Sequence, residues 1–336
     1  MLKPQQARRS AVVLALAAGI SCALPAAAAD FTMKIGFGTI NDIQHQWGNW
    51  FKEAVEARSK GRIEVKVFPR AQLGGIASMI EGAQLGTVEA VTAPADFFSG
   101  VDPRFGVFAT PVLFHNAKHA EKVILDPAMN REILALGADK NLQVVSVYPF
   151  AAAHYFGKPP IRSLNDFKGK KIRVNATAAE RAKMSLFGGT AVPMDLPEVV
   201  PGLRQGVIDG TMSAMAIYVN FKFIDLDKVI LQTNDTMIIS IGAVSRPWLA
   251  KLPADLRQVV IEEGAKLSAR TSAHSHVLDG QMEKRWKEAG GQIVTLSAAE
   301  AGRMRKLLSG VGEEVTKANP AVNAFYQKLA ATGRKY

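Results

Sequence analysis

The sequence is almost free of cysteine. Its 336 residues include a single one, Cys22, and that residue lies in an N-terminal segment that we expect to be removed on export. The rest of the chain, residues 30–336, therefore has no thiol. This absence excludes disulfides, zinc-thiolate sites and a cysteine nucleophile. We expect the packing of a hydrophobic core to supply the stability instead.

Long hydrophobic runs are also in short supply. The apolar stretch at residues 11–24 covers about 14 residues, whereas a membrane-spanning helix needs roughly 20. A basic segment precedes this stretch and small residues ending at Ala29 follow it, which is the pattern of a secretory signal peptide over residues 1–29. The pair Arg8-Arg9 leaves twin-arginine export as an alternative to general secretion, which we favour. We expect a periplasmic mature protein that is not inserted in the membrane.

The sequence contains no strong cluster of like charges. Of the 41 Lys and Arg residues, three precede residue 30, which leaves 38 against 30 Asp and Glu and a formal charge of +8 for residues 30–336. The basic residues are scattered singly among acidic ones, without interleaved aromatic residues. This pattern argues against nucleic-acid binding. It indicates a solvated basic surface that attracts anions.

Recognisable catalytic and metal-binding motifs are absent. The sequence has no His-Glu-x-x-His motif, no Gly-x-Ser-x-Gly elbow and no phosphate-binding loop. His274 and His276 are two positions apart on an expected helix, so their side chains point about 200° apart and not toward one metal ion. We therefore expect no enzyme, no cofactor and no metal site.

Strand and helix patterns alternate along the chain, which predicts an α/β class with a largely parallel sheet. Apolar residues recur at helical spacing over 47–58, and they alternate with charged ones over 63–67. The expected strands are 33–37, 63–67, 88–92, 142–147, 171–174 and 208–212, and the expected helices include 47–58, 76–83, 118–138, 178–187, 197–205 and 253–289.

The alternation stops at Tyr148-Pro149 and starts again beyond it, which indicates two lobes joined by short crossings. The helical pattern over 253–289 would extend for about 50 Å. Because this length exceeds the width of one small lobe, we expect the helix to contact both. We assign residues 30–150 with about 238–279 to lobe I, and residues 151–237 with about 280–336 to lobe II.

Short motifs follow one another in a familiar order along both blocks. The first block contains Gly61-Arg-Ile-Glu-Val-Lys-Val-Phe-Pro69, Gln72-Leu-Gly74 and Pro111-Val-Leu-Phe114; the second contains Ser163-Leu-Asn-Asp-Phe-Lys-Gly-Lys-Lys-Ile-Arg-Val174, Leu203-Arg-Gln-Gly206 and Ile208-Asp-Gly210. In this order they resemble the solute-binding proteins of TRAP transporters, the DctP family. The resemblance implies a two-lobed periplasmic-binding-protein-like fold with a hinge and a long helix that spans both lobes.

Arg173 is the residue that the resemblance singles out, because the family's Lys-Ile-Arg-Val motif carries the arginine that clamps the carboxylate of the substrate. The residue pattern agrees, since Arg173 lies near the carboxyl end of an expected strand, where open α/β sheets bind their ligands. A guanidinium also offers a planar fork that matches a carboxylate. A plain surface salt bridge is the alternative role that the residues alone leave open.

Departures from the family pattern make the expected site more apolar. Ala153 stands where many acid-binding members have a second arginine, and Met212-Ser213 stands where Glu-Asn is common. The resemblance therefore implies one bound carboxylate with an apolar or aromatic body beside it. The remaining residues predicted to bind the substrate are His45, Phe97, His154, Met194, Leu196 and Ser213.

The function that the resemblance implies is capture of a small organic acid by closure of the cleft, followed by delivery to the membrane subunits of a TRAP transporter. We expect a monomer. A binding protein of an ABC-type uptake system or a sensor is the alternative, since these proteins share the architecture but differ in partner. A periplasmic enzyme that uses the same cleft is a further alternative of a different class.

Overall fold

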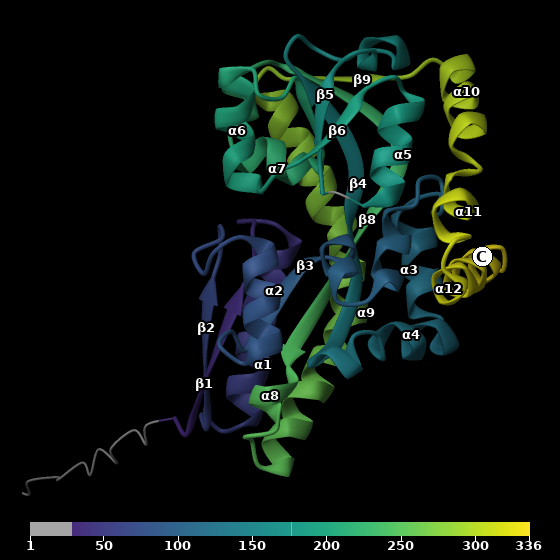
Figure 1. Ribbon diagram of the computed structural model, residues 1–336. Coiled ribbons are helices and arrows are strands. Elements are labelled where there is room, and N and C mark those ends of the chain that lie inside the picture. The colour runs from purple at the N-terminus through teal and green to yellow at the C-terminus, as the bar shows by residue number, and fades with distance from the viewer. Residues whose placement is uncertain (1–28, 176) are drawn as a thin grey trace, which may run out of the picture.

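The structure is a computed structural model that describes residues 29–175 and 177–336. The predicted signal peptide lies outside the described residues except for Ala29. Figure 1 shows two lobes, one above the other, with a long helix and two long strands running between them. Nine strands of the described residues form one sheet in the order β2-β1-β3-β8-β4-β7-β5-β6, with β9 paired to β8.

The first lobe is built on three parallel strands covered by helices. Each strand alternates buried and more exposed positions or is buried throughout, and each parallel connection passes through a helix. Its elements are β1 (Phe31–Gly36), α1 (Ile43–Arg58), β2 (Ile63–Phe68), α2 (Ile76–Leu85), β3 (Ala90–Pro94), η1 (Ala95–Gly100), η2 (Pro103–Ala109), α3 (Ala117–Leu125), α4 (Pro127–Leu134), η3 (Ala138–Lys140) and α8 (Arg246–Leu249).

The second lobe repeats this arrangement with shorter strands. The strands β5 and β6 are parallel, and β5 is also parallel to β7. Its elements are η4 (Leu164–Phe167), β5 (Lys171–Val174), α5 (Ala178–Leu186), β6 (Thr190–Pro193), α6 (Leu196–Gln205), β7 (Gly210–Ser213), α7 (Met215–Asn220), η5 (Phe223–Asp225), β9 (Gln292–Thr295), α10 (Ala298–Leu308) and α11 (Val311–Thr316).

Three long elements connect the lobes. The strands β4 (Leu142–Gly157) and β8 (Val229–Ser245) pair antiparallel over almost their whole length and so belong to both lobes. The helix α9 (Ala254–Glu288) packs against α1 in the first lobe and against α7 and β9 in the second, as its predicted length requires. The fold is therefore the two-lobed α/β fold that the sequence predicts, with the crossing made by regular structure.

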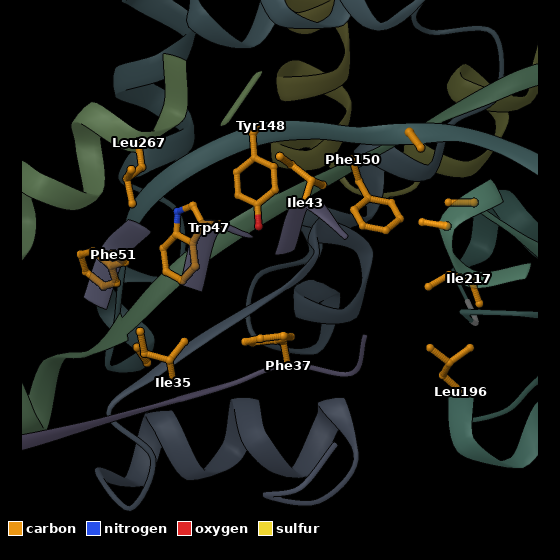
Figure 2. Packing of buried hydrophobic residues seen from close by; sticks show 14 of the residues in the cluster. Ile35, Phe37, Ile43, Trp47, Phe51, Tyr148, Phe150, Leu196, Ile217 and Leu267 are labelled. Carbon is orange, nitrogen blue, oxygen red and sulfur yellow. The ribbon is translucent and has the colours of Figure 1, made fainter. Parts of the chain in front are cut away.

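Hydrophobic residues gather in three clusters. One cluster lies between the sheet and α9 and contains residues of both lobes, from Trp47 and Phe51 to Leu196 and Ile217 (Figure 2). The other two lie on the opposite side, one in each lobe. Because the first cluster is continuous across the crossing, the two lobes share part of their core.

The structure differs from the sequence-based expectation in three respects. The sheet is mixed, since β8 runs antiparallel to β3 and β4, and β4 runs antiparallel to β7. The pattern predicts a strand only over 142–147, whereas β4 continues to Gly157, and it predicts no strand for β8. The C-terminal helix α12 (Pro320–Gly333), assigned by sequence to lobe II, packs against α3, α4 and η2 of the first lobe. The exact lobe boundaries stay a prediction.

Candidate ligand-binding site

A cavity lies between the lobes where the parallel strands of both lobes end. The volume of this cavity is about 40 Å³. The carboxyl ends of β1 and β3 face those of β5 and β7 across this space, which is where α/β sheets bind ligands. This central cavity is lined by Thr39, Gln44, Ile76, Pro94, Phe97, Phe150, Arg173, Asn175, Leu196, Met212, Ser213, Ile217 and Ile238.

Arg173 is the cation that lines the central cavity. Its side chain is only 4% exposed, and its Nε donates a hydrogen bond to the Met194 carbonyl at 2.8 Å. Among the described residues, its two Nη groups form no hydrogen bond or ion pair. The Nε side of the guanidinium is thus held by a hydrogen bond. Its two Nη groups remain available to an acceptor in the cavity.

Nearby acids offset part of the free-energy cost of burying the charge of Arg173. Burial lowers the pKa of Arg173 below its usual value, and the negative charges of Glu180 and Asp96 oppose that shift. The guanidinium remains protonated because its ordinary pKa lies far above neutrality. A buried cation with unused donors favours an anion strongly, since interactions between charges strengthen away from water.

The remaining walls of the central cavity are mainly apolar. Phe97 follows the end of β3, and Leu196 begins α6. In Figure 2 the ring of Phe150 points toward the side of the cluster where Leu196 and Ile217 lie. Together with Ile238 these side chains form a surface that suits the carbon skeleton of a small molecule.

The structure brings four of the seven predicted residues to this cavity: Arg173, Phe97, Leu196 and Ser213. Their role in binding stays a prediction. Met194 contributes its backbone carbonyl to Arg173, while its side chain lies beside Gly202 of α6 instead of in the cavity.

His45 does not line the central cavity because the start of α1 turns it away. Asp42 caps this helix by accepting hydrogen bonds from the backbone N–H groups of Gln44 and His45. The His45 Nδ1 accepts from the Asn41 N–H at 3.1 Å, and its ring stands 5.5 Å from that of Phe37. Burial lowers the pKa of His45, which favours the neutral ring in this position.

His154 also lies outside the cavity lining. It sits on β4 opposite Ser213 of β7 and Gln232 of β8, and it is fully buried. Neither ring nitrogen has a hydrogen-bond partner among the described residues. Burial lowers the pKa of His154 to about 4, with Asp235 opposing. His154 is thus not among the residues that line the central cavity, and the binding role predicted for it stays a prediction.

Sequence reasoning missed three polar residues of the cavity: Asn175, directly after β5, and the pair Thr39 and Gln44. This pair follows the carboxyl end of β1, a position of the kind that supported Arg173. The Gln44 amide is held in place, since its Oε1 accepts from the Thr39 hydroxyl at 3.1 Å and its Nε2 donates to the Ser240 hydroxyl at 2.9 Å. The two residues form a rigid polar corner opposite Arg173.

The lobes touch each other at the rim of the cavity. The Asn220 amide of α7 donates to the backbone carbonyls of Ile40 and Asn41 at 2.8 and 3.2 Å. The Arg70 guanidinium lies 5.2 Å from the centre of the Phe221 ring, a cation–π contact. These contacts join residues of the two lobes, so the lobes meet at this place.

Two features missing from the described residues bear on other classes of protein. Within 29–175 and 177–336, no three or more histidine, cysteine, aspartate or glutamate side chains are grouped so that they could hold a metal ion. In the same ranges, no helix combines the length and the apolar character needed to cross a membrane.

Two lobes with crossing strands, and a cavity between them at the strand ends, define a solute-binding protein. The chain belongs to the DctP family, the bacterial extracellular solute-binding proteins of family 7, whose model matches residues 37–318. This membership confirms the family that the motifs predict, and it confirms a binding protein in place of an enzyme.

The chain is also similar to individual proteins, and the solved structures among them share its fold. The 2,3-diketo-L-gulonate-binding periplasmic protein of Escherichia coli (strain K12) is 25% identical over 294 residues, which cover 85% of this chain and 88% of that protein. The sugar acid binding protein of Advenella mimigardefordensis, solved with galactonate, has a TM-score of 0.85 at 21% identity and covers 90% of this chain and 98% of its own. A TRAP periplasmic solute-binding protein of Shewanella oneidensis, solved with succinate, has a TM-score of 0.83 at 23% identity, with coverages of 90% and 99%.

Proposed function

We propose that this protein is the periplasmic receptor of a TRAP transporter for a small organic acid. A secretory signal over residues 1–29 would export it, and the mature chain would work as a monomer that delivers its ligand to the membrane subunits. The observation that carries the proposal is the buried guanidinium of Arg173, whose Nη groups are unused among the described residues at a cavity between two lobes.

The side chains that line this cavity favour a monocarboxylate with an apolar or aromatic body. The carboxylate would form a bidentate pair with Arg173, and the body would lie along Phe97, Phe150 and Ile217. The similar proteins named above bind acids, which supports the carboxylate. Apolar walls around a single cation support the rest of the proposal.

The first experiment identifies the ligand. Native mass spectrometry of protein exported to the periplasm should give the mass of a chain that begins at Asp30. It should also show a co-purified acid bound to the protein. Calorimetry of that acid then gives its affinity for the wild-type protein and for Arg173→Ala. We expect the variant to lose about 100-fold or more in affinity, since removal of one partner of a buried charge pair costs several kcal/mol.

Arg204→Ala is the matched control, because Arg204 lies in the same lobe but is exposed on α6. This control should leave the affinity unchanged. An unchanged affinity in Arg173→Ala would contradict the proposal, provided that circular dichroism shows a folded protein. Turnover of the bound acid would favour an enzyme, and capture of the protein by ABC-type subunits instead of TRAP subunits would move it to the other transport class.

A further inference from the structure

A smaller cavity adjoins the central one on the side of the second lobe. The two cavities share Asn175, Met212 and Ile238 in their linings. The smaller cavity differs by its acids, because Asp96 and Glu180 line it. A ligand bound at Arg173 and extended past Asn175 would therefore reach carboxylate oxygens.

Asp96 has an acceptor atom that nothing in the described residues uses. The residue is 8% exposed, and its Oδ2 accepts a hydrogen bond from the Asn175 amide at 3.0 Å. Within 29–175 and 177–336, its Oδ1 is buried without a hydrogen-bond partner, and no ion pair joins Asp96 to Arg173. A buried carboxylate oxygen without a donor is costly, so this atom favours a donor from outside the chain.

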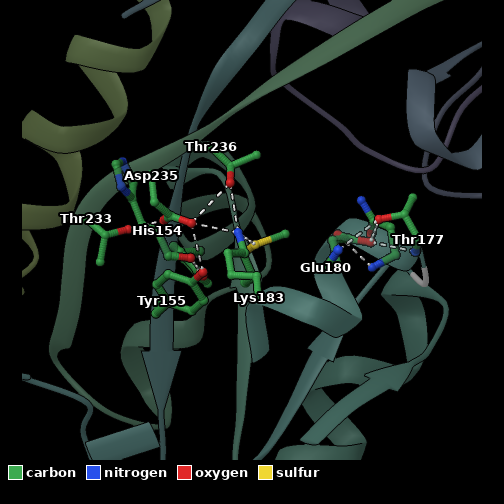
Figure 3. Close-up of polar contacts among 11 residues, drawn as sticks. His154, Tyr155, Thr177, Glu180, Lys183, Thr233, Asp235 and Thr236 are labelled. Atoms are coloured by element: carbon green, nitrogen blue, oxygen red, sulfur yellow. Dashed lines mark hydrogen bonds and ion pairs between the residues drawn. The ribbon is translucent and has the colours of Figure 1, made fainter. Parts of the chain in front are cut away.

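Glu180, the other acid of the smaller cavity, is already occupied. Its carboxylate accepts hydrogen bonds from the Thr177 backbone N–H and hydroxyl at 2.9 and 3.0 Å, and from the Asn175 N–H at 3.2 Å. Figure 3 shows these contacts at the start of α5. They form a capping box. Glu180 thus holds α5 in place, while Asp96 is the acid left to meet a ligand.

The charges around Asp96 favour the same kind of donor. Burial, and next the negative charge of Glu180, raise the pKa of Asp96 to about 7, while the Asn175 hydrogen bond, the charge of Arg173 and the Phe97 backbone N–H oppose this shift. A ligand carboxylate at Arg173 adds another negative charge to the site. A hydrogen-bond donor on the ligand, above all a cationic one, would offset the negative charge of Asp96.

We infer that Asp96 is a specificity-determining residue, whose buried Oδ1 accepts a hydrogen bond from an N–H or O–H group at the far end of the carboxylic acid held by Arg173. This inference rests on the proposed function and adds to it. The ligand then has a carboxylate, an apolar body and one donor, which is either an ammonium or a hydroxyl group.

Calorimetry with matched acids tests the inference on the wild-type protein. The probes are straight-chain acids of four to six carbons that end in a methyl, a hydroxyl or an ammonium group. We expect the donor-bearing acid of the fitting length to bind about tenfold more tightly or better than its methyl counterpart, because hydrogen bonds to charged groups are among the stronger ones. Equal or tighter binding of the methyl acid would overturn the inference.

Two variants separate the sources of the donor. Asp96→Asn keeps an acceptor of similar size but removes the charge, so it should abolish a preference for the ammonium and largely keep one for the hydroxyl. Asp96→Leu should abolish both preferences. A preference that survives in Asp96→Leu would also overturn the inference. The wild-type comparison needs no variant, so a folding defect in either one leaves the test intact.

Failure of this inference can be distinguished from failure of the proposed function. If all acids bind equally to the wild-type protein and all lose affinity in Arg173→Ala, the receptor function stands and the role of Asp96 fails. If no acid binds and Arg173→Ala changes nothing, the proposed function itself fails.

Discussion

Arg173 and His154 lie in the interior strands of the second lobe, and the structure gives these two buried bases different surroundings. Arg173 is at a strand end with one hydrogen bond and a cavity in front of it. His154 is in the middle of the sheet, without a partner among the described residues. Of these two buried bases, only Arg173 is among the residues that line the central cavity.

His154 should therefore affect stability and leave binding unchanged. Its folded-state pKa is about 4, below the usual 6.5. The unfolded chain takes up a proton as the pH falls through 6.5 while the folded protein does not, so this residue's contribution to stability is lost between pH 6.5 and about 4. When the pH is lowered from 7 to 5, the free energy of unfolding should fall less in His154→Leu than in the wild-type protein. The difference between the two decreases should be about 2 kcal/mol.

Urea denaturation at the two pH values measures this difference. His276→Leu is the control, because His276 is exposed on α9, and this variant should keep the wild-type pH dependence. The same pH dependence in His154→Leu and the wild-type protein would contradict a buried neutral imidazole. A large loss of ligand affinity in His154→Leu would return the residue to the binding site.

At the scale of elements, the two crossing strands carry the irregularities that shape the cleft. Pairing of β4 and β8 is interrupted near Pro149, which has no N–H to donate. It is interrupted again where Ala152 pairs with Met237 and His154 with Gln232, so that residues 233–236 bulge out of the ladder. Asn234 adopts a positive φ of 52° in this bulge, which asparagine tolerates better than most residues.

A buried ion pair fixes the bulge in β8. The Lys183 Nζ lies 2.7 Å from the Asp235 Oδ2, and both side chains are fully buried. Lys183 also donates to the Thr236 hydroxyl at 2.8 Å, and the Tyr155 hydroxyl donates to Asp235 at 3.3 Å (Figure 3). Burial raises the pKa of Asp235, but Lys183 and the hydroxyls of Thr233 and Thr236 together outweigh it, and the net shift is downward.

Loss of one partner of this pair should be more damaging than loss of both. Lys183→Met leaves the charge of Asp235 buried and unpaired, and we expect it to lower the free energy of unfolding by about 3 to 5 kcal/mol. Lys183→Met combined with Asp235→Leu should recover a large part of that loss. Denaturant unfolding measures both, and a double variant less stable than the single one would contradict the expectation. Lys317→Met, in an exposed pair with Glu314, should change stability little.

At the scale of the whole molecule, closure of the lobes is a balance between contacts across the cleft and solvation of the open surfaces. The Asn220 hydrogen bonds to Ile40 and Asn41 exist only when the lobes meet. Ligand binding to the closed form shifts this balance in proportion to the difference in affinity between the two forms. Residues far from Arg173 can therefore change the apparent affinity.

Asn220→Ala should weaken ligand binding without touching the cavity. Loss of two hydrogen bonds of the closed form should lower the affinity about three- to tenfold, and small-angle X-ray scattering should show a larger radius of gyration in the absence of ligand. Asn130→Ala is the control, since the Asn130 amide makes one hydrogen bond, to Ile124, within the first lobe. Equal affinities in the wild-type protein and Asn220→Ala would show that these contacts do not govern closure.

The sequence alone determined the elements and the position of the key cation. The spacing of apolar residues predicted α1, β2, β5 and α9, because the positions that an element buries recur with the period of a helix or of a strand. Motif order predicted the family. The family resemblance singled out Arg173 and the strand-end rule agreed with it; the same rule would have pointed to Thr39 and Gln44.

Only the tertiary structure decided what surrounds that cation. The strand β8 escaped prediction because Asn234, Asp235 and Gly242 resemble breakers; yet the first two form the bulge, and a Cβ at Gly242 would clash with the Trp47 ring. Whether Asp96 is paired or free, and whether His154 faces the cavity, depends on contacts between segments about 80 residues apart or on the register of a central strand. The local sequence pattern cannot predict such contacts. They are set by packing between the lobes, and the period of one element does not reflect that packing.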